Sequence, residues 1–352
     1  NRSKRNLIES GNKGHPCCES GRGESAGRII KKMEDICLTR KGGYSMDVYG
    51  LGTLAMDVLI QVDALPGEDS FCIVKSSERQ PGGSGTNVIV QLARLGAKCG
   101  FIGAVGDDDI GKDVLESLAK EQVDNQSMVV KPGMTTLHTD IVIDSEGRKF
   151  IMLNMGNAFG DLKPEEVNTE VISQAKVFYT DLLPGAAAMH GLKYAKEHDV
   201  MTAFNMQVGL STLGGLGVTA KDVLDSLAYV DVFAPCQEGL YELTGTRDLD
   251  ECAKFLRKYC KGVLLFTLGK KGSVAYDPED HKYEVPSCKI QAVDTTGAGD
   301  SYMGAFVYQF CLKHSNLEDS MKFATRCAAY TCTGIGARFT PTLQQVSEFQ
   351  AE

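Results

Sequence analysis

From Met46 onward, short apolar runs alternate with helical patterns, and this alternation constrains the fold more than any other feature of the chain. Residues 101–105 have the composition of a buried strand, and residues 111–122 place their apolar side chains on one helical face. Further strands are expected at residues 176–179, 200–204, 230–233 and 263–266, with a helix at 186–198. Strands that alternate with helices predict an α/β protein whose mostly parallel sheet is covered on both faces.

Two segments, residues 58–80 and 135–155, alternate polar and apolar residues instead. The second contains Asp144-Ser145-Glu146-Gly147, a sequence that favours a hairpin turn. Half-buried strands cannot join a sheet that is covered on both faces, so a separate small sheet is expected, as a lid or a subunit contact. Because an exposed apolar sheet face usually finds a partner surface, these strands also suggest a homodimer.

Composition restricts the partners and the compartment of the chain. A net charge of −9 over 352 residues argues against nucleic acid and against an anionic membrane surface. It does not exclude a nucleotide, because phosphate sites are built locally from N–H groups and dipoles. No apolar run is long enough to span a bilayer. The 12 cysteines are scattered and form no C-x-x-C pair, which predicts reduced thiols in a cytoplasmic protein.

Residues 1–45 differ in composition from the rest of the chain. They are rich in Arg, Lys, Gly, Ser and Glu and have no apolar core of the kind a signal peptide needs. We expect a leader that is disordered or derived from an expression vector, with Met46 as the natural start.

The segment Gly50-Leu51-Gly52-Thr53-Leu54-Ala55 matches the dinucleotide fingerprint G-x-G-x-x-A. That fingerprint requires a helix to begin at the turn, so that the helix N-terminus meets the pyrophosphate. Residues 57–63 instead alternate like a strand. A dehydrogenase is therefore kept only as a third alternative, and a P-loop kinase is excluded because no G-x-x-x-x-G-K-[ST] occurs.

The stretch from Val293 to Phe306 predicts a strand, a glycine turn and a helix, with Asp300 in the first helical turn. Amide groups at a helix N-terminus lack internal partners and bind phosphate readily. A carboxylate beside such a site fits one task, which is to take a proton from a hydroxyl as that hydroxyl attacks phosphorus.

Three other segments are ambiguous when considered singly. Residues 81–87, Pro-Gly-Gly-Ser-Gly-Thr-Asn, form either a ligand loop or an ordinary helix cap. Thr267-x-Gly269-x-x-Gly272 follows a strand and forms either a turn or the floor of a nucleotide pocket, and Asp57 alone is equally consistent with a surface charge.

In this order, Asp57, Gly82-Gly83-x-x-x-Asn87, Thr267-x-Gly269-x-x-Gly272 and Asp294-Thr-x-Gly297-Ala-Gly299-Asp300 resemble the PfkB carbohydrate kinase family. The resemblance covers residues 46–341. It implies a ribokinase-like three-layer α/β sandwich with a mostly parallel central sheet and a small β-sheet lid. The kinase domain would span residues 46–345, with lid strands at about 58–80 and 132–156 and a C-terminal tail at 346–352.

The resemblance also implies a role for each matching residue in an ATP-dependent sugar kinase. Asp300 corresponds to the general base. The anion hole corresponds to Gly297, Ala298 and Gly299. Substrate-holding positions correspond to Asp57, Gly83, Ser84 and Asn87. The ATP pocket corresponds to Thr267, Gly269 and Gly272.

The chain departs from the family at the metal end of this site. Members carry N-x-x-E before Leu-Thr-Gly, whereas here Cys236 and Gly239 stand at the Asn and Glu positions. Glu238 is one residue off and is the candidate Mg²⁺ ligand. Carbonyls around Thr333 to Thr340 loosely resemble a loop that holds a monovalent cation, which would be K⁺.

The sequence leaves the substrate open. Ala55 and Ser84 stand where ribokinases commonly carry Asn and Lys, which argues against ribose, and Asn205 resembles nucleoside kinases. The alternatives to a sugar kinase are a nucleoside kinase of the same family and a non-catalytic relative that binds a sugar or nucleotide. Asp300 argues against the second, because a binding protein needs no base there.

Overall fold

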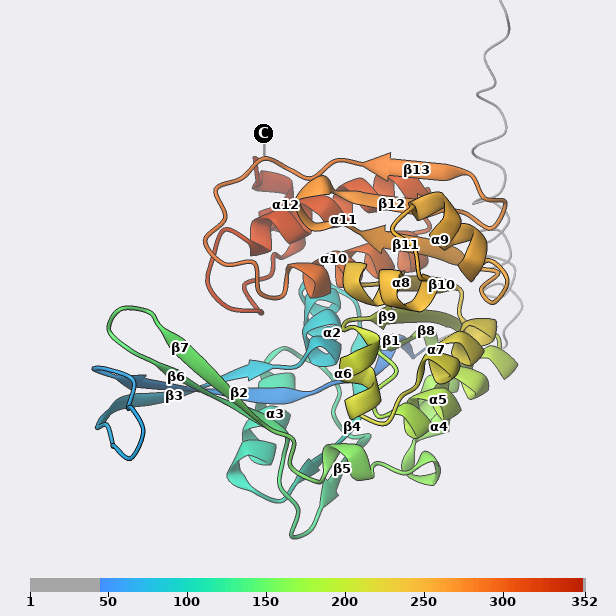
Figure 1. Cartoon of the computed structure of the whole chain (residues 1–352). Helices are drawn as coiled ribbons and strands as arrows, with labels where there is room; N and C mark the ends of the chain where they lie inside the picture. The colour runs from blue at the N-terminus through green and yellow to red at the C-terminus, as the bar shows by residue number, and fades with distance from the viewer. Residues whose placement is uncertain (1–44, 351–352) are drawn as a thin grey trace, which may run out of the picture.

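The computed structural model describes residues 45–350, and the leader expected at residues 1–45 lies outside them except for its last residue. These residues form two sheets, a large one within a body of helices and a small one that projects from it (Figure 1). No helix within residues 45–350 is both long and apolar enough to cross a bilayer.

The large sheet has nine strands in the order β13-β12-β11-β10-β9-β8-β1-β4-β5. In chain order these are β1 (Met46–Leu51), β4 (Cys99–Gly106), β5 (Met128–Lys131), β8 (Ala175–Thr180), β9 (Met201–Met206), β10 (Val232–Pro235), β11 (Val263–Thr267), β12 (Ser273–Tyr276) and β13 (Lys282–Val285). The strands from β5 to β11 are parallel, and β12 and β13 add an antiparallel edge. The prediction of a mostly parallel sheet is confirmed.

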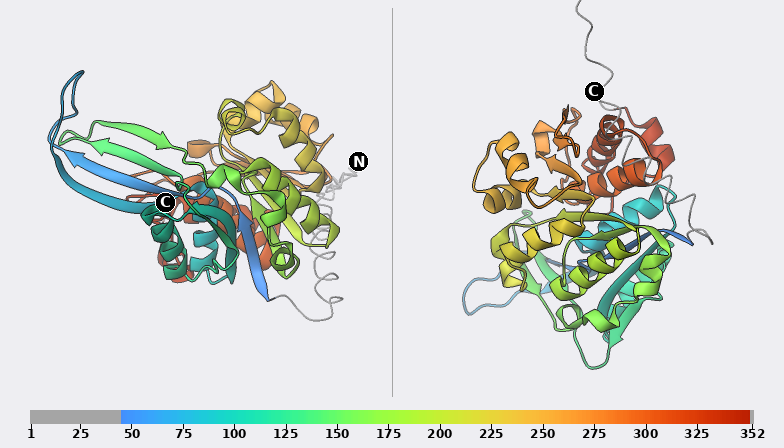
Figure 2. Two further views of the ribbon diagram at one scale, coloured as in Figure 1. Left: turned by 90° about the horizontal axis from the view of Figure 1, so that it is seen from below. Right: turned by 90° about the vertical axis from the view of Figure 1, so that its right-hand side faces the viewer.

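The helices of the body cover both faces of this sheet. They are α2 (Ser84–Arg94), α3 (Asp109–Lys120), α4 (Thr169–Ser173), α5 (Gly185–Glu197), α6 (Leu210–Gly215), α7 (Ala220–Ser226), α8 (Gln237–Thr244), α9 (Leu249–Leu256), α10 (Ala298–Phe306), α11 (Leu317–Thr331) and α12 (Leu343–Glu348). The chain crosses from β1 to β4 through α2 and, in the opposite direction, from β8 to β9 through α5. Since such crossovers are right-handed, α2 and α5 lie on opposite faces, which gives the expected three layers (Figure 2).

The direction of the connections reverses between β1 and β8, which are neighbours in the sheet. In open parallel sheets a ligand crevice forms outside the carboxyl ends of the strands at such a switch point. The fold therefore predicts a site where β1 and β8 end.

The small sheet has the order β3-β2-β6-β7. Its strands are β2 (Ala55–Val62), β3 (Val74–Gly82), β6 (His138–Ile143) and β7 (Lys149–Asn154). The two alternating segments of the sequence thus pair with each other, and the hairpin predicted at residues 144–147 joins β6 to β7. Its first two strands run from Ala55 to Gly82, a few residues beyond the expected bounds of 58–80, so the base of the sheet reaches the switch point.

The glycines of the dinucleotide-like segment have packing roles. A Cβ at Gly50 would lie 2.5 Å from the Ile89 side chain of α2, and one at Gly52 would lie 2.9 Å from the carboxylate of Asp181. After this turn the chain enters β2 rather than a helix. The segment therefore lacks the helix N-terminus that a dinucleotide site requires, as the alternation of residues 57–63 predicts.

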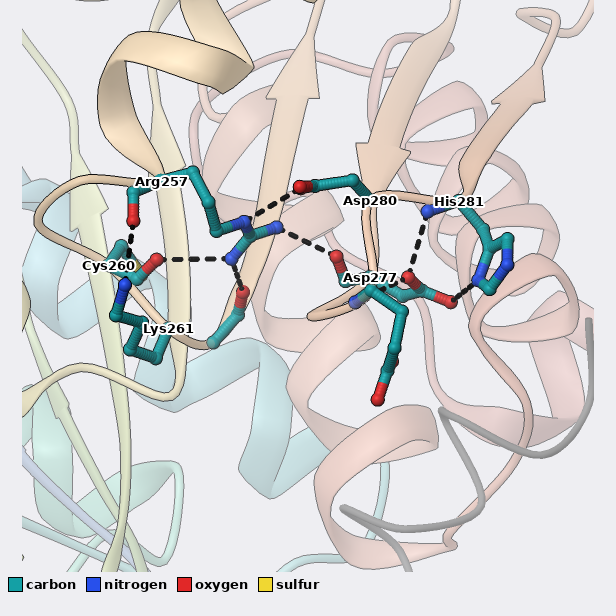
Figure 3. Close-up of polar contacts among 8 residues, drawn as sticks. Arg257, Cys260, Lys261, Asp277, Asp280 and His281 are labelled. Carbon is teal, nitrogen blue, oxygen red and sulfur yellow. Dashed lines mark hydrogen bonds and ion pairs between the residues drawn. The ribbon is translucent and has the colours of Figure 1, made fainter.

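Arg257, at the end of α9, forms hydrogen bonds with the β12–β13 turn at the antiparallel edge of the large sheet (Figure 3). The Arg257 guanidinium donates to the carbonyls of Cys260 and Gly262 and to the carbonyl of Asp277 in the β12–β13 turn. Its Nε also donates to Asp280 at 2.8 Å. Within the turn, the buried Asp277 carboxylate accepts from the backbone N–H and the ring Nδ1 of His281. The cluster is structural and holds the edge next to α10 in place.

One expectation for the C-terminal third is wrong, and the domain boundary stays a prediction. The strand predicted before the glycine turn is wrong, because Val293 lies in an irregular segment and its N–H bonds to the carbonyl of Cys332 near the end of α11. The domain boundary expected at residue 345 falls inside α12, whose Val346 is buried. Arg326 of α11 donates to the carbonyls of Val346 and Phe349, so the chain stays packed beyond that boundary.

Candidate active site

A cavity of about 370 Å³ opens where β1, β8 and β9 end, at the switch point of the large sheet. The base of the small sheet and the N-terminus of α10 complete its walls. Its polar lining consists of Thr53, Asp57, Ser84, Asn87, Thr139, Asp181, Gln207, Thr212, Thr296 and Asp300, and its apolar lining includes Leu137, Leu153, Met155, Phe159, Leu183, Leu213 and Leu216. Residues from widely separated parts of the sequence therefore meet at one place.

Asp300 lies in the first turn of α10, as predicted, and its carboxylate is buried within this cavity. Asn87 of α2 donates from Nδ2 to Asp300 Oδ2 at 2.9 Å. Burial, together with the negative charge of Asp181, raises the pKa of Asp300 to about 7, and the hydrogen bond from Asn87 opposes this shift. A carboxylate with a pKa near 7 is matched to proton transfer at neutral pH.

The glycine cluster before α2 is shaped by close backbone packing. Gly83 has φ of 86°, and a Cβ there would lie 2.6 Å from the backbone of Leu54 and Ala55. This approach brings Ser84 and Asn87, in the first turn of α2, to the end of β1. Gly83, Ser84 and Asn87, three of the predicted substrate positions, thus line the cavity.

Asp57 enters the cavity from β2 of the small sheet. It is paired in register with Thr139 of β6, and a Cβ at Gly82 would lie 2.8 Å from its carboxylate. Burial raises the pKa of Asp57, while a hydrogen bond from the Thr139 hydroxyl and the charge of Arg338 pull it down. Its attachment to the small sheet means that movement of this sheet would move Asp57.

A third carboxylate, Asp181, lines the cavity and was missed in the sequence. It follows β8 directly, and its carboxylate accepts backbone N–H bonds from Thr53 at 2.7 Å and from Leu183 at 3.1 Å. Burial raises its pKa to about 6 against the effect of these bonds. Its one sequence signal is its place at the carboxyl end of a buried strand, where ligand-binding residues gather.

The turn that begins α10 has the geometry of an anion site. Gly297 caps the helix with φ of 77°, in the left-handed region. The Ala298 N–H bonds to the Thr295 carbonyl, whereas within the described chain the amides of Gly299 and Asp300 donate to no protein acceptor. Free amides at a helix N-terminus stabilise negative charge. Of the predicted anion hole, Gly297 lines the cavity, and the amides of Gly297 and Gly299 donate to no protein acceptor within the described chain.

The predicted ATP residues lie outside this cavity, on the loop that follows β11. Thr267 ends the strand, and Gly269 has φ of 57° with open space where a Cβ would stand. Gly272 has a packing explanation, because a Cβ there would lie 2.1 Å from the Val285 carbonyl oxygen. Ser273, the next residue, accepts a hydrogen bond from Tyr302 of α10 at 2.8 Å, so this loop is tied to the helix that carries Asp300.

The residues considered for a metal, Cys236, Glu238 and Gly239, lie at the start of α8. Cys236 caps this helix, with its sulfur accepting from the Gly239 N–H, so the residue in the expected Asn position has a capping role. Glu238 is exposed in the first turn. Among the described residues, no three His, Cys, Asp or Glu side chains gather to hold a metal. Glu238 therefore fits Mg²⁺ only as one carboxylate beside phosphate and water oxygens.

The carbonyls predicted for K⁺ are partly engaged by the protein itself. Arg94 of α2 donates from one terminal nitrogen to the carbonyls of Arg338 and Thr340, at 2.5 and 3.2 Å. Two oxygens of the segment from Thr333 to Thr340 thus already have a cationic partner. A K⁺ site in this loop stays a prediction, and it would have to use the other oxygens.

Comparison with known proteins agrees with this geometry. The model of the pfkB family of carbohydrate kinases matches residues 47–343. A probable fructokinase-2 of Arabidopsis thaliana is 30% identical over 292 residues, covering 78% of this chain and 88% of that protein. An ATP-dependent ribose-1-phosphate kinase of Halopiger xanaduensis is 30% identical over 316 residues, covering 87% and 98%.

Solved structures show the same fold. The ribokinase of Arabidopsis thaliana, complexed with ribose and ATP, has a TM-score of 0.74 at 22% identity, covering 87% of this chain and 99% of that one. A nucleoside kinase of Methanocaldococcus jannaschii has a TM-score of 0.71 at 18% identity, covering 87% and 98%. With the family model matched over most of its length, the chain belongs to the pfkB family of carbohydrate kinases.

Proposed function

We propose that this protein transfers the γ-phosphoryl group of ATP to a hydroxyl of an uncharged sugar. The observation that carries the proposal is the position of Asp300, a buried carboxylate in the first turn of α10 that faces a cavity of sugar size. Fructokinase relatives at about 30% identity support a sugar as the acceptor.

The chemistry follows from the residues at the two ends of the cavity. Asp57 and Asn87 hold sugar hydroxyls, since a carboxylate accepts from two hydroxyls and an amide both donates and accepts. Asp300 takes the proton of the attacking hydroxyl, and the free amides at the start of α10 stabilise the charge that builds on the phosphoryl oxygens. When bound, Mg²⁺ would neutralise phosphate charge beside Glu238.

The charge of the cavity favours a neutral substrate. Its lining contains three carboxylates, those of Asp57, Asp181 and Asp300, and no Lys, Arg or His among the described residues. An anionic group in this space would meet repulsion from these carboxylates, and the lining itself offers no cation to pair with it. The cavity thus resembles one for a free sugar, as the name of the fructokinase relative suggests, more than one for a sugar phosphate.

A nucleoside is the second candidate, and the apolar wall of the cavity favours it. Leu153, Met155 and Phe159 form part of a surface on which a base could stack. The order of kcat/KM for fructose, ribose and adenosine separates the two candidates.

The test is ADP release by purified protein with ATP, Mg²⁺ and a panel of fructose, ribose, adenosine and ribose 1-phosphate. We expect turnover of a neutral sugar and at least 100-fold lower kcat/KM for the sugar phosphate, about 3 kcal/mol in transition-state binding. Binding of sugar and ATP without ADP release would support the non-catalytic relative instead. Preferred turnover of ribose 1-phosphate would contradict the neutral-substrate proposal.

The pH dependence of the reaction should report Asp300. Its pKa of about 7 lies above the ordinary value, so the base is protonated below that pH. We expect kcat/KM to rise with pH through about 7 and then level off. This rise is the acidic limb of the pH profile. In D181N the acidic limb should move to lower pH, because the negative charge of Asp181 raises the pKa of Asp300 in wild type. A limb that stays in place in D181N would contradict the assignment.

We also propose that two copies associate through the small sheet in the cytoplasm. Strand β7 is exposed along its length although Phe150, Ile151, Met152 and Leu153 are apolar. Sedimentation velocity should show a dimer that I151D converts to a monomer, whereas V130D, on the exposed face of β5, should not. A monomeric wild-type protein would contradict the association.

The nine cysteines within residues 45–350 are free thiols, which supports the proposed location in a reducing compartment such as the cytoplasm.

A further inference from the structure

Residues 336–338, which follow α11, connect the two halves of the active site. The Gly336 N–H donates to the Asp294 carboxylate at 2.9 Å. The Ala337 carbonyl lies against Gly297, so closely that a Cβ on Gly297 would be 2.4 Å from its oxygen. The Arg338 side chain turns the other way, toward α2. Three consecutive residues thus join the phosphate end of the site to its sugar end.

The Arg338 guanidinium contacts only neutral acceptors. Its Nε donates to Asn87 Oδ1 at 3.1 Å, and one terminal nitrogen donates to the Thr86 hydroxyl at 3.1 Å and the Gly82 carbonyl at 3.4 Å. The other terminal nitrogen lies 3.4 Å from the Ser117 hydroxyl. No carboxylate pairs with it directly in the described chain, so its charge acts through space on the nearby acids.

The contact with Asn87 determines which way the Asn87 amide faces. A side-chain amide has an acceptor oxygen and a donor nitrogen, so an oxygen fixed by Arg338 leaves the nitrogen toward Asp300. This is the bond of 2.9 Å from Nδ2 to Asp300 Oδ2. If the amide turned by 180°, its oxygen would oppose the carboxylate and the hydrogen bond would be lost.

We propose that Arg338 is a positioning residue for phosphoryl transfer. Through its hydrogen bond to Asn87 it keeps a donor on Asp300 and holds both side chains at the acceptor hydroxyl. This inference rests on the proposed function, and it adds a residue that does not line the cavity.

The backbone of Arg338 is itself anchored. Arg94 of α2 donates to its carbonyl and is paired on its other side with Glu121 through two hydrogen bonds. Hydrogen bonds from Arg94 of α2 to the loop, and from Arg338 of the loop to α2, thus hold the loop and α2 together. The site is therefore organised before substrate binds, which lowers the cost of reaching the reactive geometry.

The charges around this pair are few. Asp300 is faced by Asp181 and by the phenol of Tyr179 from β8, with neutral Ser84, Asn87 and Gln207 as further neighbours. Arg338 is faced by Glu121, Arg94, Asp57 and Asp300. Burial lowers the pKa of Arg338 to about 10, so the guanidinium stays charged over the pH range of the assay. Loss of this positive charge should raise the pKa of Asp300, so the rise of kcat/KM with pH should occur at higher pH.

The test compares R338M, R338Q and R338K with wild type. R338M removes donor and charge, so we expect kcat to fall roughly 10- to 100-fold and the acidic limb of kcat/KM to move to higher pH. R338Q keeps a donor but no charge and should also shift the limb. R338K keeps the charge and should restore the limb. The matched control R326M removes an arginine that bonds the carbonyls of the C-terminal segment, and it should lower the melting temperature without moving the limb.

A second measurement does not depend on turnover. The melting temperature of wild type should fall as pH rises from about 4 to about 7 and then level off, and in R338M this fall should continue to higher pH. In the D300N background, R338M should cause no such movement. The positioning role would be overturned if R338Q kept the wild-type kcat, the wild-type pH dependence of kcat/KM and the wild-type pH dependence of the melting temperature. Absence of sugar turnover in wild type would instead overturn the proposed function and leave this second test valid.

Discussion

In D300N, kcat should fall about 10³-fold, within the range that general-base catalysis contributes. Asparagine has nearly the shape of aspartate, and its oxygen can still accept the hydrogen bond from Asn87 that holds Asp300 in wild type. ATP and sugar should therefore bind nearly as before, so the loss appears in kcat more than in KM. Steady-state ADP release together with calorimetric titration of both ligands measures this separation. Retention of more than a tenth of the wild-type kcat would contradict the role of Asp300.

The same variant should be more stable than wild type at alkaline pH. The pKa of Asp300 lies at about 7 instead of 3.8, which means that the folded protein disfavours the ionised carboxylate by about 4 kcal/mol. The contribution of Asp300 to the free energy of unfolding of wild type is therefore most favourable below about pH 4, and it declines as pH rises to about 7. D300N lacks this decline. Melting temperatures at pH 5 and pH 8 should differ less in D300N than in wild type.

G297A is expected to impair both folding and catalysis. Alanine in the left-handed region costs about 1–2 kcal/mol, and its Cβ would lie 2.4 Å from the Ala337 carbonyl oxygen. Relief of this clash must shift either the first turn of α10 or the loop that carries Arg338. We expect a loss of stability of about 2–3 kcal/mol and, in the folded fraction, a fall in kcat of about 100-fold through the displaced anion site.

G299A is the matched control, since it changes a second glycine of the same turn. A Cβ at Gly299 meets nothing within 4 Å, and Gly299 is already helical. Its stability should be unchanged or slightly higher, because alanine favours a helix by about 1 kcal/mol over glycine. Denaturant unfolding measures both variants. Equal losses in G297A and G299A would contradict the clash as the cause.

The main architecture could be predicted from local patterns. Buried runs such as residues 101–105 became central strands because continuous apolar sequence suits a sheet covered on both faces. The alternating segments became the small sheet because a period of two leaves one face outside the main core. Asp300 was identifiable because the glycines before it predict a helix N-terminus, whereas Asn87 was singled out only through the resemblance to the family.

Other features depend on contacts that no local pattern records. Arg338 lies 251 residues from Asn87 in the sequence, and nothing around it distinguishes it from a surface arginine. Asp181 follows an ordinary buried strand, and only the reversal of connections next to β8 makes that position a site. The strand predicted at Val293 did not form because its N–H bonds to the end of α11 and not to a sheet.

Asp300, and not the neighbouring Asp181, is the residue we propose to accept the proton of the sugar hydroxyl. The most direct test is a structure with the preferred sugar and a non-hydrolysable ATP analogue bound. We expect the acceptor hydroxyl to lie about 2.6–3.2 Å from an Asp300 carboxylate oxygen, in line with the γ-phosphorus. An acceptor hydroxyl bonded to Asp181 and out of reach of Asp300 would contradict it.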